Sequence, residues 1–113
     1  HQSIVPNAIQ EMLLQSHEGV VRLFPCWSRE CGNARFGTLR ARGAFLVSAE
    51  FRDGKIGGVK VVSEKGRNCT MVNPWPGKKV QLVRNGRNTE TLTGARFTFN
   101  TSVNDTFELS QSL

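Results

Sequence analysis

The nine carboxylates are the first residues that could do chemistry, because general acid–base catalysis needs paired carboxylates beside one bond. They are spread along the whole sequence: Glu11, Glu18, Glu30, Glu50, Asp53, Glu64, Glu90, Asp105 and Glu108. Asp53 and Asp105 fall at predicted turns, and the four glutamates that follow Glu30 fall on the polar faces or at the ends of predicted strands. We therefore interpret them as structural residues and predict no catalytic residue in this chain. A pair assembled across two strands is the alternative.

The cysteines and histidines offer little for a metal site or a nucleophile. Cys26, Cys31 and Cys69 are an odd number of thiols and too few for a disulfide scaffold. Cys26 and Cys31 could pair across a loop in an oxidising compartment, and the sequence leaves this open. With His1 and His17 as the only imidazoles, a zinc site lacks ligands. A pair of Cys31 with His17 lacks an orienting partner. We predict no metal and no cofactor.

The two tryptophans, Trp27 and Trp75, are the candidate binding residues. Both lie in predicted loops, where an exposed ring can stack on a sugar or contact a neighbouring domain. Trp75 stands between two prolines and is the stronger candidate. The alternative is that both rings cap the ends of a hydrophobic core.

Composition and charge indicate one folded domain without a nucleic-acid or membrane partner. The 113 residues are 38% hydrophobic and 21% charged, with a net charge of +6. The basic residues are scattered, and only Lys78 and Lys79 are adjacent, so no nucleic-acid-binding motif is formed. No apolar stretch approaches the length of a transmembrane helix.

The elements that position these residues begin with a predicted N-terminal helix over residues 4–16. Val5, Ile9, Met12 and Leu13 share one helical face, and Gly19 is a stop signal. Because this helix is short, its apolar stripe needs a partner. We expect the stripe either to pack on the rest of the chain or to cause self-association with a second copy.

After Gly19 the pattern becomes short strands separated by turns. Residues 26–38 are rich in Ser, Gly, Asn and charge, which predicts a loop. Asp53-Gly54 and Asn85-Gly86 are strong signals of two-residue hairpins. The sequence therefore predicts an all-β fold, an antiparallel β-sandwich (jelly-roll-like) of about eight strands, preceded by one short α-helix.

The strand register around Asp53-Gly54 requires one irregularity. A tight turn pairs Phe51 with Ile56, but an unbroken ladder would then set Val47 opposite Lys60. One extra residue at Gly57-Gly58 moves Val61 opposite Val47 and restores apolar pairing. The alternation thus predicts a β-bulge at these two glycines.

Several segments in order resemble a known enzyme family. They are Glu11-Met-Leu-Leu-Gln-Ser-His-Glu-Gly19, Arg22-Leu-Phe-Pro25, Leu39-Arg-Ala-Arg-Gly-Ala-Phe45, Asp53-Gly54-Lys55, Ser63-Glu-Lys-Gly66 and Asn73-Pro-Trp-Pro-Gly77. As a set they resemble the end of the catalytic barrel and the C-terminal β-domain of family 95 glycoside hydrolases, the α-L-fucosidase family.

The resemblance implies a non-catalytic accessory domain that braces an (α/α)6 barrel. Residues 1–18 would be the last barrel helix and residues 19–113 the C-terminal β-sandwich. The family's catalytic carboxylates lie in the barrel, so none is carried over to this chain. The implied partner is the catalytic helical domain, and the implied location is periplasmic or extracellular. The alternative function is a carbohydrate-binding module that binds glycans through Trp75 or Trp27.

Overall fold

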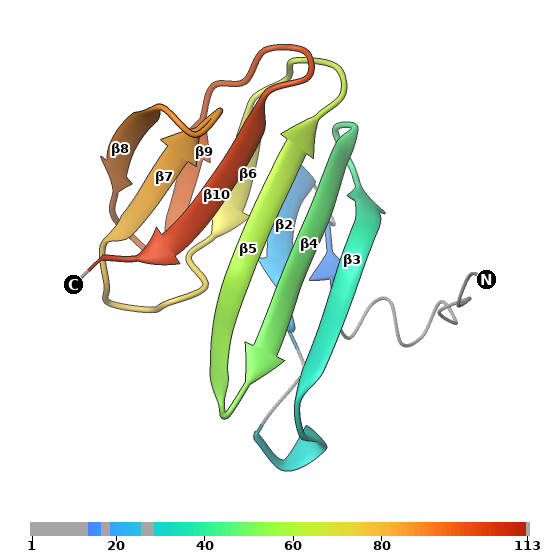
Figure 1. Ribbon diagram of the computed structural model, residues 1–113, viewed down its shortest axis with the longest axis vertical. Helices are drawn as coiled ribbons and strands as arrows, with labels where there is room; N and C mark the ends of the chain where they lie inside the picture. Colours follow the sequence, from blue (N-terminus) through green and yellow to red (C-terminus); the bar gives the residue numbers. More distant parts are fainter. Residues whose placement is uncertain (1–13, 17–18, 26–28, 113) are drawn as a thin grey trace.

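The chain forms two β-sheets stacked as two layers (Figure 1). The computed structural model describes residues 14–16, 19–25 and 29–112. The strands are β1 (Leu14–Gln15), β2 (Val20–Leu23), β3 (Ala34–Ala41), β4 (Phe45–Arg52), β5 (Lys55–Ser63), β6 (Cys69–Val72), β7 (Val80–Arg84), β8 (Asn88–Leu92), β9 (Arg96–Phe99) and β10 (Thr106–Gln111), with a 3-10 turn η2 (Arg29–Cys31). The predicted all-β class is confirmed. The described residues contain ten strands in place of about eight.

The strand order places four strands in one sheet and six in the other. The smaller sheet runs β1-β2-β6-β9 and the larger runs β3-β4-β5-β10-β7-β8. Every neighbouring pair is antiparallel except β2 and β6, which are parallel. This unequal division differs from the eight strands of a jelly roll.

The predicted N-terminal helix is wrong where the structure describes it. Leu14 and Gln15 form strand β1, in which Leu14 pairs with Leu23 and Gln15 with Arg22. Leu14 is only 8% exposed and belongs to the core. The edge of β2 offers backbone hydrogen bonds and a cross-strand apolar partner, which outweigh the helical period of a short segment. The helical stripe, residues 5–13, and the self-association expected from it lie outside the described residues.

The predicted loop over residues 26–38 is also wrong at its end, because β3 begins at Ala34. β3 is the edge strand of the larger sheet and bonds only to β4. Phe36 pairs with Ala49 and Leu39 with Val47, so two residues of β3 face Ser48 alone. This bulge interrupts the alternation that identifies a strand, and bulges are common on edge strands, where they hinder pairing with other chains.

Both predicted two-residue turns are confirmed. Asp53 and Gly54 have φ of 53° and 78°, and Asn85 and Gly86 have φ of 53° and 69°. Positive φ at both central residues matches the right-handed twist of the flanking strands. Phe51 pairs with Ile56 across the first turn, as expected.

The β-bulge predicted near Gly57-Gly58 is confirmed as well. The register shifts between Ser48 and Glu50, so that Ala49 stands opposite both Gly58 and Val59. Gly58 has φ of 58°, the left-handed conformation of the first residue in a glycine bulge. Beyond the bulge Val47 pairs with Val61, and both side chains are fully buried.

The core lies between the two sheets and draws on both. Phe99 of β9 and Phe107 of β10 are 4.9 Å apart between ring centroids and join the sheets on one side. Phe24, after β2, packs at 5.5 and 5.6 Å on Phe36 and Phe51 of the larger sheet. Burial of each such ring stabilises the fold by about 1.5–3 kcal/mol. The described chain therefore has a closed core of its own.

Candidate functional site

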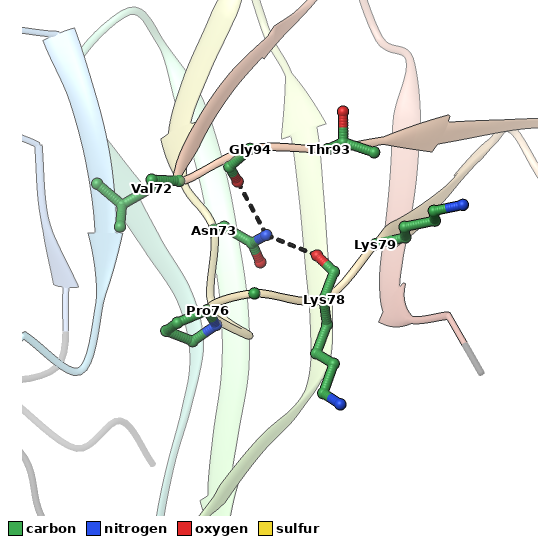
Figure 2. A pocket seen from close by; sticks show the side chains of 9 residues that line it. Val72, Asn73, Pro76, Lys78, Lys79, Thr93 and Gly94 are labelled. Atoms are coloured by element: carbon green, nitrogen blue, oxygen red, sulfur yellow. Dashed lines mark hydrogen bonds between the residues drawn. The ribbon is translucent and has the colours of Figure 1, made fainter.

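Asn73 organises the loop that carries the candidate tryptophan. Its Oδ1 accepts a hydrogen bond from the backbone N–H of Trp75 at 2.8 Å. Its Nδ2 donates to the carbonyl of Lys78 at 2.9 Å and to that of Gly94 at 3.0 Å (Figure 2). One 3%-exposed amide thus joins the loop between β6 and β7 to the loop between β8 and β9.

Trp75 is a core residue in this structure. The residue is 8% exposed, and its Nε1 donates to the backbone carbonyl of Ile56 on β5 at 2.8 Å. The ring therefore anchors the loop to the larger sheet, as expected for a tryptophan that caps a core. It presents no broad exposed face of the kind that stacks on a sugar. Trp27, the other candidate, lies outside the described residues.

A mainly apolar pocket of about 600 Å³ lies beside this loop. Its lining comes from the end of β6 and the two loops that Asn73 joins: Val72, Asn73, Pro76, Gly77, Lys78, Lys79, Thr93, Gly94 and Ala95. Figure 2 shows the side chains of Lys78 and Lys79 extending away from Asn73 in different directions. Because every polar atom of the Asn73 side chain is engaged by the protein, the pocket suits an apolar group.

Sequence reasoning missed this pocket. The Asn-Pro-Trp-Pro-Gly segment marked a rigid loop, and an asparagine that bonds its own backbone two residues on is a recognisable turn signal. The approach of Gly94 to Asn73 depends on strand pairing between β6 and β9, for which the local sequence holds no signal.

Four of the carboxylates considered for acid–base chemistry have structural partners. Ion pairs join Glu50 to Arg52 (3.1 Å), Glu64 to Arg40 (3.3 Å), and both Glu90 (3.4 Å) and Asp105 (3.0 Å) to Arg84. The Asn85 amide, the Ser102 backbone N–H and the Arg84 guanidinium hold the pKa of Asp105 below its ordinary value. Arg84 also lies 4.8 Å from the centroid of the Phe107 ring. These contacts hold strands and turns of the domain in place.

The cysteines are in unlike surroundings. Cys31 is exposed, whereas Cys69 on β6 is fully buried, and burial raises the pKa of its thiol to about 12. Cys26, the other half of the disulfide considered with Cys31, lies outside the described residues. Within the described part of the chain, no three His, Cys, Asp or Glu residues gather as metal ligands would. No helix in that part has the length and apolar character needed to cross a bilayer.

Comparison with known proteins identifies the family. The family model for the C-terminal domain of glycoside hydrolase family 95 matches residues 15–109. Comparison with curated proteins finds no match. The matched segment begins within β1 and ends within β10, so it takes in both sheets and the pocket. The chain therefore belongs to glycoside hydrolase family 95, as the C-terminal domain of that family.

Proposed function

We propose that this domain is a non-catalytic accessory domain that braces the catalytic (α/α)6 barrel of an α-L-fucosidase-like glycoside hydrolase. The family match supports it, because the match covers nearly every described element of a domain defined by its C-terminal position in such enzymes. The ion-paired carboxylates and the buried Trp75 favour bracing over catalysis or sugar binding by this chain.

The physical basis of bracing is preferential binding to the folded catalytic domain. A covalently attached partner that contacts only the folded form stabilises it by mass action. The attachment also gives that contact a high effective concentration. A sandwich with its own hydrophobic core suits this role, because it stays folded and keeps its surface while the neighbouring domain begins to unfold.

The proposal includes a domain boundary and a location. Since Leu14 lies in the core of the sandwich, we place the boundary before Leu14 instead of at residue 18. The preceding residues would then connect to the catalytic barrel. A periplasmic or extracellular location belongs to the same proposal, and fractionation of cells that express the whole polypeptide tests it.

Removal of the domain tests the proposed function. The whole polypeptide is compared with a form that lacks residues 14–113 and with the 113-residue chain alone. We expect the shortened form to lose its activity on aryl α-L-fucosides at a lower temperature, and the chain alone to hydrolyse none. Equal thermal inactivation of the whole polypeptide and of the shortened form would contradict bracing. Hydrolysis by the chain alone, lost on substitution of one of its own carboxylates, would contradict the non-catalytic role.

A further inference from the structure

The outer surface of the smaller sheet differs from the rest of the molecule in its charge. We name it the basic face and define it by Arg22, Thr70, Val72, Arg96 and Thr98 together with the pocket around Asn73. The burial pattern places these side chains outward, since the residues that alternate with them along the strands are buried. Val20 stands beside Thr70 on the same surface and is itself only 7% exposed. The register sets Thr70 beside Thr98 and Val72 beside Arg96. The pocket continues this surface, because Val72 belongs to both.

The basic face carries cations without carboxylates. Its described charged residues are Arg22, Arg96, Lys78 and Lys79, and strands β1, β2, β6 and β9 contain no Asp or Glu. No ion pair joins these four cations to a described carboxylate.

The outer surface of the larger sheet carries charges of both signs. There, Arg52 pairs with Glu50 and Arg40 with Glu64, as on an ordinary solvated surface. Unmatched charge of one sign beside an apolar hollow is typical of a surface that meets a partner of the opposite sign.

The residues that line the pocket indicate which kind of chemical group the partner places in it. The pocket offers Val72, Pro76, Ala95 and the stems of two lysines, but no aromatic ring for sugar stacking. Both polar atoms of the Asn73 side chain already hydrogen-bond within the protein. An apolar side chain flanked by carboxylates fits this lining better than a sugar does.

The course of the chain indicates where that partner comes from. β1 is the edge strand of the same sheet, so residues 1–13 join the domain there. β6 lies two strands from β1, a distance of about 10 Å at ordinary strand spacing. A domain that precedes this one in the polypeptide is thus attached at the edge of the smaller sheet.

We propose that the basic face is the surface through which this domain docks on the catalytic domain of the same polypeptide. An apolar side chain of the catalytic domain enters the pocket. Carboxylates on the catalytic domain around that side chain face Arg22, Arg96, Lys78 and Lys79. This inference rests on the proposed bracing function and adds to it the surface and the chemistry of the contact.

Cysteine accessibility tests the docking surface. Thr93→Cys introduces a thiol in the pocket, and Ser110→Cys introduces one on the outer surface of the larger sheet, both at exposed positions. Each variant is labelled with a maleimide in the 113-residue chain and in the whole polypeptide, with the modified peptides resolved by mass spectrometry. We expect attachment to slow labelling of Thr93→Cys by about tenfold or more and to leave Ser110→Cys unchanged.

The other outcomes separate the docking surface from the proposed function. Slower labelling of Ser110→Cys alone would contradict docking through the basic face but would still show a contact between the domains. Unchanged labelling of both would overturn docking and bracing together. Protection of Thr93→Cys in the 113-residue chain by added polygalacturonate, without protection by attachment, would assign the face to an acidic glycan and overturn the proposal.

Charge reversal tests the role of the lysines. In the whole polypeptide, Lys78→Glu with Lys79→Glu is expected to restore labelling of Thr93→Cys toward the rate in the 113-residue chain. Lys55→Glu with Lys60→Glu, at exposed positions on the larger sheet, is the matched control and is expected to leave the rate unchanged. Equal effects of the two pairs would contradict charge complementarity at the basic face.

Discussion

At the scale of the residue, Gly58 carries the bend that keeps β4 and β5 in register. Its φ is 58°, and a Cβ there would lie 3.2 Å from Oε1 of Glu50. Gly58→Ala should lower the free energy of unfolding by about 1–2 kcal/mol, because L-residues pay that cost in the left-handed region. Gly57→Ala is the control, since no atom lies within 4 Å of its added Cβ. Urea unfolding measures both, and equal effects would refute the special role of Gly58.

Cys69 yields a second prediction at this scale. Burial raises the pKa of its thiol from 9.0 to about 12, so the folded protein holds the thiol in its unreactive form. We expect maleimide to modify Cys69 at pH 8 only after unfolding in urea. The stabilising preference for the neutral thiol is complete below pH 9 and is lost as the pH rises toward 12. Labelling of Cys69 in the native chain at the rate found in the unfolded chain would contradict this account.

Single residues also differ in how far the sequence predicts them. The Asp53-Gly54 and Asn85-Gly86 turns could be predicted because their φ values depend on residue type and adjacent strands. The burial of Trp75 could not, since it depends on a carbonyl of Ile56 nineteen positions away. Local chemistry therefore predicts turns better than it predicts which loop side chains enter the core.

At the scale of the element, Asp105 fastens the start of β10 to the β7–β8 hairpin. It accepts hydrogen bonds from Asn85, Arg84 and the Ser102 backbone, and these contacts lower its pKa. Asp105→Asn should therefore destabilise the chain at pH 7. The difference in stability between the two proteins should shrink as the pH falls from the ordinary aspartate pKa of about 3.9 through the lower pKa of Asp105 in the folded chain. Urea unfolding at several pH values checks this, and a loss that grows in acid would contradict it.

The loop between β6 and β7 depends on the indole of Trp75. Trp75→Phe keeps an aromatic ring in the core but leaves the Ile56 carbonyl without its donor. We expect the free energy of unfolding to fall by about 1–3 kcal/mol, the cost of an unsatisfied buried acceptor. Trp75→Ala should cost about 3–5 kcal/mol, because it also removes the ring. Unchanged stability of Trp75→Phe in urea would show that the hydrogen bond does not hold the loop.

Elements with a clear local pattern were predictable, and the edge strands β1 and β3 were not. β4 alternates over eight residues, and β5 alternates beyond its bulge at Gly57-Gly58, so their pairing followed from the sequence. β3 is interrupted at Gly37 and Thr38, and β1 has only two residues. Edge strands need one ladder and little burial, which leaves a weak pattern in the sequence. The errors at residues 14–15 and 34–38 have this common cause.

At the scale of the whole molecule, the two outer surfaces have different composition. The larger sheet exposes charges of both signs, some of them ion-paired, whereas the basic face has four cations and no described carboxylate beside an apolar pocket. The family and the sandwich could be predicted from the sequence, because family-like motifs and strand patterns follow one another in order along the chain. This asymmetry could not be predicted, since the cations come from β2, β9 and a loop that only the fold brings to one face.

The coupling of unfolding between the two domains is the most direct test of the central claim, that this domain braces the catalytic domain. The measurement is differential scanning calorimetry of the whole polypeptide carrying Gly58→Ala, with Gly57→Ala as the control. A destabilisation of 1 kcal/mol lowers the unfolding temperature of a domain of this size by about 4–8 °C. We predict that Gly58→Ala lowers the unfolding temperature of the catalytic domain together with that of the sandwich. A shift of the sandwich transition alone would contradict the claim.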